Sequence, residues 1–151
     1  MTTTTVPASG TVNRIAGFGF GAVFLLVGVI GFAITTETPF TATHGKMLLF
    51  FELNPTHDLV HAGVGIALAG AAGIGAGWAK AANTLIGGVY LLVGLAGFFL
   101  LHAPVNLLAV NHPDNVLHVL AGALLVGVGV VRLPRPSEDR DDVEEAAEPD
   151  A

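Results

Sequence analysis

The sequence contains no cysteine and little charge. Without cysteine, disulfides and thiolate metal sites are excluded, and cysteine usage says nothing about the redox compartment. Only 12% of the residues are charged, whereas 52% are hydrophobic. Soluble globular domains carry about 25% charged residues, so the chain lacks half of the usual solvating charge.

The charge that is present is unevenly distributed. Eight of the twelve acidic residues fall between Glu138 and Asp150. The net charge of −6 therefore belongs to the C-terminal tail. Residues 1–133 carry four acids and four bases, and this balance provides no basic face for nucleic acid.

Four long apolar runs follow one another and predict an all-α fold. A run of about twenty helical residues spans the roughly 30 Å of a bilayer core, and lipid requires each segment to satisfy its own backbone. We expect a four-helix transmembrane bundle over residues 14–133, with a disordered segment at 1–13 and a disordered acidic tail at 134–151. The helices are expected at about 15–35, 55–79, 84–102 and 113–133.

The connections differ in length. Residues 35–53 form the longest one, and the apolar stretch Met47 to Phe51 is predicted to lie in the membrane interface. Lys80 to Asn83 is predicted to be a tight turn. Arg14, Lys80 and Arg132 fall on one side of a four-span arrangement, with Lys46 on the other, so the positive-inside rule predicts cytoplasmic termini in the cell membrane.

Two motifs repeat in the same order. Residues 21–32, GAVFLLVGVIGF, match residues 87–98, GGVYLLVGLAGF, at an offset of 66. Residues 54–61, NPTHDLVH, match residues 111–118, NHPDNVLH, at an offset of 57. This order predicts two tandem helix-pair repeats related by an axis along the membrane normal, with the second and fourth helices facing each other across it. Close helix packing is expected at small-residue spacings, namely Gly17/Gly21, Gly28/Gly31, Gly73/Gly77 and Gly94/Gly97.

Part of the second motif is a helix-start signal. Asn54 is a favourable N-cap before Pro55, and Asn111 or His112 takes this place in the other copy. Asp58 and Asp114 then face the positive ends of their helix dipoles. The histidines are not explained in this way.

Three interpretations of the histidines remain open. In the leading one, His61 and His118 form hydrogen bonds to neighbouring carbonyls and hold the outer end of the bundle together. In the second, a metal is bound with imidazole and carboxylate ligands drawn from His57, His61, His118, Asp58 and Asp114, with Glu52 nearby. In the third, His61 and His118 bind a haem, with Gly65 and Gly122 leaving room for it. Proton or small-ligand handling is a further function open to ionisable groups at membrane depth.

The sequence does not favour an enzyme. Serine occurs only at Ser9 and Ser137, outside the apolar runs, and no nucleophile–base arrangement or phosphate-binding loop is visible. No catalytic residue is therefore assigned. We expect a structural or interaction role, with the bilayer and a second copy or another membrane protein as partners. The alternative is a histidine-ligated metal- or haem-binding redox protein, and the cofactor stays open.

The two histidine motifs resemble a known family, the bacterial and archaeal membrane proteins grouped as domain-of-unknown-function family 4383. The resemblance rests on residues 51–61, FELNPTHDLVH, and 111–118, NHPDNVLH, and covers about residues 14–132. Asp58 departs from it, because the family more often has Asn there, as Asn115 does in the second copy. The resemblance implies four membrane helices and no established activity.

Overall fold

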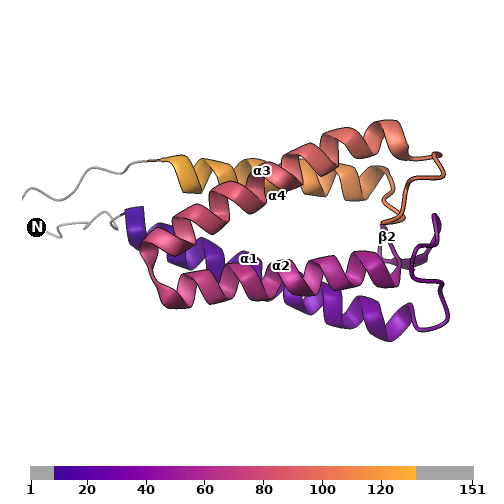
Figure 1. Ribbon diagram of the computed structural model, residues 1–151, viewed down its shortest axis with the longest axis horizontal. Helices are drawn as coiled ribbons and strands as arrows, with labels where there is room; N and C mark the ends of the chain where they lie inside the picture. Colours follow the sequence, from indigo (N-terminus) through magenta and orange to yellow (C-terminus); the bar gives the residue numbers. More distant parts are fainter. Residues whose placement is uncertain (1–8, 132–151) are drawn as a thin grey trace, which may run out of the picture.

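Four α-helices and one short β-hairpin form the described part of the chain (Figure 1). The structure is a computed structural model that describes residues 9–131. Its helices are α1 (Ser9–Ile34), α2 (Pro55–Ile74), α3 (Ala76–Leu100) and α4 (His112–Val130). Each is long and apolar enough to cross a membrane, which confirms the all-α four-helix fold. The tail predicted at 134–151 lies outside the described residues.

The helices pack as two hairpins. The most extensive contacts join α1 to α2 and α3 to α4, and Figure 1 shows the two pairs side by side. Between the pairs, α1 contacts α3, α2 contacts α3, and α1 touches α4. The backbones of α1 and α3 come close to each other, whereas α2 and α4, which were predicted to face each other, meet through the rings of His57, His61 and His118.

Glycines allow the two helices of each hairpin to approach closely. A Cβ atom on Gly28 would lie 2.6 Å from the backbone nitrogen of Ala62. A Cβ atom on Gly94 would lie 2.8 Å from the backbone nitrogen of Val119. Real Cβ atoms do not approach backbone this closely, so any larger residue would push the helices apart. The predicted close packing at these glycines is therefore present.

The contacts of one hairpin correspond to those of the other. Gly28 matches Gly94 at the offset of 66, and their partners Ala62 and Val119 match at the offset of 57. A duplicated helix pair would produce this correspondence, although the repeat itself stays a prediction. The expected packing of Gly73 and Gly77 is wrong, because a Cβ added to either one would meet no atom of another helix within 4 Å.

The helix boundaries differ from the predicted ones at the terminal end of the bundle, which is the end where α1 begins and α4 ends. Helix α1 begins at Ser9, inside the segment predicted to be disordered. Helix α2 ends at Ile74, and the extended residue Gly75 alone separates it from α3. The predicted turn at Lys80 to Asn83 is therefore wrong. These residues continue α3 because Gly75, not the polar residues after Trp78, provides the break.

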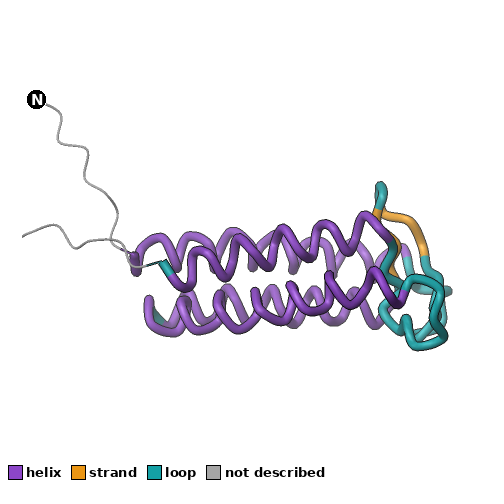
Figure 2. Tube along the Cα trace, turned by 90° about the horizontal axis from the view of Figure 1, so that it is seen from above, coloured by secondary structure: helices purple, strands orange, loops and turns teal. Residues whose placement is uncertain are grey.

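The opposite end of the bundle carries the longer connections. Strands β1 (Lys46–Leu48) and β2 (Phe51–Leu53) form an antiparallel hairpin in which Met47 pairs with Glu52. The stretch predicted to lie in the membrane interface is thus mostly this hairpin. Figure 2 shows the strands and loops at one end and both ends of the helical chain at the other.

A buried amide pair joins α1 and α3 at the terminal end. The Asn83 Nδ2 donates to the backbone and side-chain oxygens of Asn13, both at 3.0 Å. The Asn13 Nδ2 in turn donates to the carbonyl of Val128 at 3.2 Å. Both asparagines are buried, so this pair connects three helices by hydrogen bonds that lipid cannot replace.

We expect Asn83→Ala to lower the free energy of unfolding by about 1–2 kcal/mol, since interhelical hydrogen bonds in membranes contribute about 0.6–1.7 kcal/mol each. Thermal unfolding in one detergent measures the change. Thr84→Ala is the control, because the Thr84 hydroxyl donates only to Lys80 of its own helix. Equal effects of the two substitutions, or additive effects of Asn83→Ala and Asn13→Ala in a double-mutant cycle, would contradict this assignment.

Candidate metal centre

The two histidine-bearing helices start with asparagine caps. The Asn54 Oδ1 accepts the backbone N–H of His57 at 2.8 Å, directly before Pro55. In α4, Asn111 and Asp114 form a reciprocal capping box. Asn111 is therefore the cap of the second copy, and His112 is the first helical residue.

The first cap also holds two connections in place. The Asn54 Nδ2 donates to the carbonyls of Ala42 at 2.7 Å and Leu107 at 2.9 Å, and the residue is fully buried. Asp114 has a similar role, because its Oδ2 accepts the N–H of Glu52 as well as that of Asn111, each at 3.0 Å. These bonds fix the strand β2 against the start of α4.

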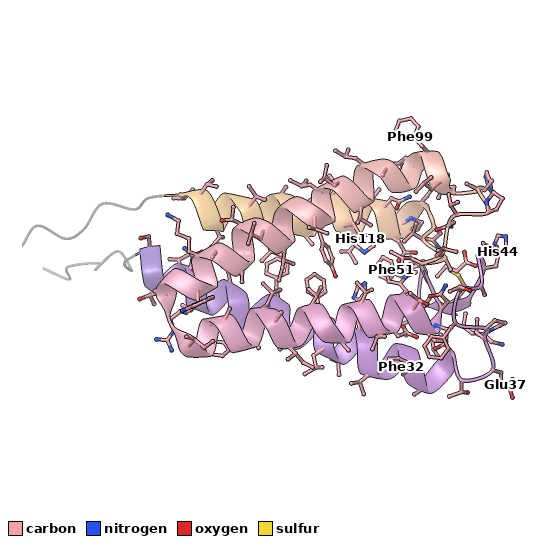
Figure 3. The ribbon with its side chains drawn as sticks, in the orientation of Figure 1. Phe32, Glu37, His44, Phe51, Phe99 and His118 are labelled. Carbon is pink, nitrogen blue, oxygen red and sulfur yellow. The ribbon has the colours of Figure 1, made fainter. Side chains whose placement is uncertain are left out.

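Three histidines meet between the two helical hairpins. His57 and His61 lie one turn apart on α2, and their Nε2 atoms are 2.9 Å apart. The ring of His118, from α4, lies 5.6 Å from the ring of His57 and 5.9 Å from that of His61, measured between centroids. One nitrogen from each ring can be chosen so that all three lie within 4.8 Å of one another. Figure 3 shows His118 reaching from α4 into the middle of the bundle.

The hydrogen bonds of His57 orient its ring. The His57 Nδ1 lies 3.2 Å from the carbonyl oxygen of Glu52. A carbonyl can only accept, so Nδ1 carries the proton and the Nε2 of a neutral ring presents its lone pair to His61. A metal-bound histidine usually donates its other N–H to such a backbone carbonyl. His57 thus already has the geometry of a ligand.

Two other ring nitrogens of the cluster have no partner in the described part of the chain. The Nδ1 atoms of His61 and His118 are buried and have no hydrogen-bond partner among residues 9–131. The His57, His61 and His118 side chains are 1%, 4% and 5% exposed. The leading interpretation required His61 and His118 each to form a hydrogen bond to a neighbouring carbonyl, and neither Nδ1 atom forms one within residues 9–131.

Two aromatic rings, those of Phe24 and Tyr90, border the histidine cluster. Phe24 meets His61 edge-to-face at 5.4 Å, Tyr90 meets His118 edge-to-face at 5.0 Å, and the two aromatic rings lie 4.9 Å apart. The Tyr90 hydroxyl is buried without a hydrogen-bond partner among residues 9–131. Leaving a buried hydroxyl unpaired costs about 1–3 kcal/mol.

The predicted carboxylate ligands point elsewhere. The Asp58 Oδ2 accepts the hydroxyl proton of Thr35 at 2.6 Å, next to Gly31 of α1. Asp114 is occupied by backbone N–H groups, and the Glu52 carboxylate accepts the N–H of Gly45 at 2.8 Å. Among residues 9–131, the histidine cluster contains no carboxylate. It is therefore an all-imidazole site.

Gly65 and Gly122 do not leave the room that a haem would need. A Cβ atom on Gly65 would lie 2.5 Å from the backbone nitrogen of Leu25, and one on Gly122 would lie 2.6 Å from that of Leu91. The neighbouring helices α1 and α3 fill these positions. The glycines therefore serve packing within each hairpin, and a haem between His61 and His118 does not fit this arrangement.

Sequence reasoning missed Tyr90, Phe24 and the Glu52 carbonyl. The repeat contained a signal for the first two, because Phe24 and Tyr90 occupy the same place in the motifs at 21–32 and 87–98. No pattern of residue types could identify the carbonyl. Its contact with His57 depends on the course of the chain between β2 and α2.

A model of the family described as "Domain of unknown function (DUF4383)" matches residues 14–131. The chain belongs to this family. The match includes all four helices apart from the first turns of α1, and it confirms the resemblance of the two histidine motifs. No curated protein and no solved structure matches the chain significantly. Family membership and four apolar helices together indicate a multi-pass membrane protein.

Proposed function

We propose that this DUF4383 protein binds a first-row transition metal through His57, His61 and His118. The observation that carries the proposal is the convergence of three buried ring nitrogens within 4.8 Å. Two nitrogens bound to one tetrahedral metal at about 2.0–2.1 Å lie roughly 3.3 Å apart. The 2.9 Å between the Nε2 atoms of His57 and His61 is close to this separation.

The ligand set favours zinc or copper. Imidazole suits zinc, copper, iron and nickel, whereas calcium and magnesium require oxygen ligands. Three histidines leave a fourth position open for an exchangeable ligand, as in catalytic rather than structural zinc sites.

Metal content of the purified protein tests the proposal. We expect about one zinc or copper ion per chain after loading and desalting, and less than about a tenth of that for His57→Ala, His61→Ala or His118→Ala, because removing one of three ligands leaves a two-coordinate site. His102→Ala is the control, since this histidine is exposed and outside the cluster. Equal metal content in the control and the three variants would contradict the proposal and return the cluster to a structural role.

We further propose that both termini are cytoplasmic. Arg14 and Lys80 lie at the terminal end of the helices and Lys46 at the loop end, which supports this orientation under the positive-inside rule. A membrane-impermeant maleimide should label His44→Cys in intact cells and should not label Ser137→Cys. Reversed labelling would place the histidine cluster toward the cytoplasm.

A further inference from the structure

Two apolar cavities flank the histidine cluster, and their walls correspond residue by residue. One lies between α1 and α4 and the other between α2 and α3, and both are lined by His61 and His118. The walls supplied by α1 and α3 differ by the offset of 66: Val23, Phe24 and Val27 in the first cavity, and Val89, Tyr90 and Val93 in the second.

The other walls correspond as well. At the offset of 57, Val60 and Val64 of the α2/α3 cavity match Leu117 and Ala121 of the α1/α4 cavity. At these positions, equivalent residues of the two predicted repeats therefore form the walls of both cavities. Any difference in function between them must come from the positions at which they differ.

The first difference is that the β-hairpin covers one of the two cavities. Leu48 and Leu49 of the β-hairpin line the α1/α4 cavity, and they belong to the connection that is longer in the first half of the chain. The α2/α3 cavity has no strand residue along its wall, and the connection between α3 and α4 contributes only Leu108 to it. It is bordered by Val60, Leu85 and Val89, which are 41%, 70% and 56% exposed on the surface that would face lipid. Figure 1 shows α3 rising away from α2 toward this end of the bundle.

The second difference is polar. The α2/α3 cavity has Tyr90 and His57 where the other cavity has Phe24 and Asp114. The Asp114 carboxylate is already occupied by two backbone N–H groups. The Tyr90 hydroxyl is unpartnered among residues 9–131, and the residue is only 4% exposed. Phe24 packs in the equivalent place without a hydroxyl, so packing alone does not require the oxygen of Tyr90.

The size of the cavity limits what can enter. Its volume is about 190 Å³, and an apolar cavity of about 150 Å³ holds one benzene ring. Apart from the three histidines, the wall is apolar and carries one hydroxyl, that of Tyr90. A hydroxyl donor in such a wall fits a single ring that carries a hydrogen-bond acceptor.

We propose that the α2/α3 cavity binds a lipid-soluble, single-ring carbonyl compound of the quinone class, which enters from the bilayer between α2 and α3 and accepts a hydrogen bond from Tyr90. The histidine cluster forms the inner wall of this site. Binding at the cavity does not require a metal, so this proposal stands apart from the metal-binding one.

Binding of tetramethyl-1,4-benzoquinone to the full-length protein in nanodiscs tests the proposal, with empty nanodiscs correcting for partition into lipid. Durene, the hydrocarbon with the same four methyl groups, is the control ligand. We expect saturable binding of one quinone. Tyr90→Phe should weaken quinone binding about tenfold or more, and should leave durene binding within about twofold, because only the quinone uses the hydroxyl.

A matched pair of variants tests the location. Val89→Trp should abolish binding by filling the mouth of the α2/α3 cavity, whereas Val23→Trp, at the equivalent and equally exposed position, should leave binding unchanged. Both variants place the added bulk on a lipid-facing surface, so folding should survive. Equal affinity for quinone and durene, no effect of Tyr90→Phe, or loss of binding in Val23→Trp rather than Val89→Trp would overturn the proposal. Each binding measurement is made with metal-loaded and with metal-stripped protein. This comparison distinguishes failure of the quinone-binding proposal from failure of the metal-binding proposal.

Discussion

Gly28→Val is expected to destabilise the protein by about 3 kcal/mol or more, the upper end of the cost of overpacking a well-packed interior. The added Cβ would meet the backbone nitrogen of Ala62 at 2.6 Å and the carbonyl oxygen of Asp58 at 2.7 Å. Both contacts are backbone atoms inside α2, which cannot rotate aside as a flexible side chain can. The helices α1 and α2 would have to separate along the hairpin.

Thermal unfolding of detergent-purified protein measures this loss. Gly63→Val is the matched control, because Gly63 lies in α2 and an added Cβ would meet no atom of another helix within 4 Å. The control should change the stability by less than about 0.5 kcal/mol, as surface substitutions do. Gly94→Val should behave like Gly28→Val, since its Cβ would lie 2.8 Å from backbone atoms of Asn115 and Val119. A Gly28→Val protein as stable as Gly63→Val would show that the hairpins are more loosely packed than described.

Asn54→Ala is expected to have the second-largest effect. It removes the N-cap of α2, worth about 1 kcal/mol, and leaves the carbonyls of Ala42 and Leu107 without their donor, at about 1–3 kcal/mol for each buried group. The total loss should be about 3 kcal/mol or more. It should also weaken metal binding, because His57 lies in the turn that Asn54 caps.

Asn54→Ser separates the two parts of this effect. Serine keeps an N-cap acceptor for the N–H of His57 and lacks the amide that donates to the two loop carbonyls. We expect its loss of stability to be smaller than that of Asn54→Ala by about 1 kcal/mol, the contribution of the cap. Thermal unfolding and metal content of both variants provide the comparison. Equal stability of the two variants would show that the cap contributes nothing here.

The membrane fold could be predicted from the sequence because lipid leaves few alternatives. Runs of uncharged apolar residues must be helical in a bilayer, and the glycines of the repeated motif predicted the close contacts of Gly28 and Gly94. The same logic failed at Lys80 to Asn83. Polar residues there indicated a turn, but the Asn83 amide finds partners on α1, so the helix continues through them.

The candidate site could be predicted only in part. The histidines that meet were named beforehand, since the spacing of His57 and His61 places them on one helix face. The carboxylates were assigned to the same site by proximity in sequence. Asp58 follows His57 directly and therefore points about 100° away around the helix, where it meets Thr35 of α1. The direction in which a side chain points from its helix decides whether it can be a ligand here. The sequence alone does not say which face of a helix packs against which neighbouring helix.

The role of Gly65 and Gly122 shows the same limit. A glycine one turn below a histidine indicated space, and the structure fills that space with the backbone of α1 or α3. The room near the histidines lies instead between the hairpins, where the walls come from residues in all four helices. Such a cavity depends on how two hairpins dock, and residue spacing within one helix does not encode that.

X-ray absorption spectroscopy of the zinc-loaded protein tests the central claim most directly. The account predicts a first shell of three or four nitrogen or oxygen ligands at about 2.0 Å, with the outer-shell scattering of three imidazole rings, and loss of that imidazole pattern in His118→Ala. An octahedral shell of oxygen ligands, or an unchanged imidazole pattern in His118→Ala, would contradict a metal centre formed by His57, His61 and His118.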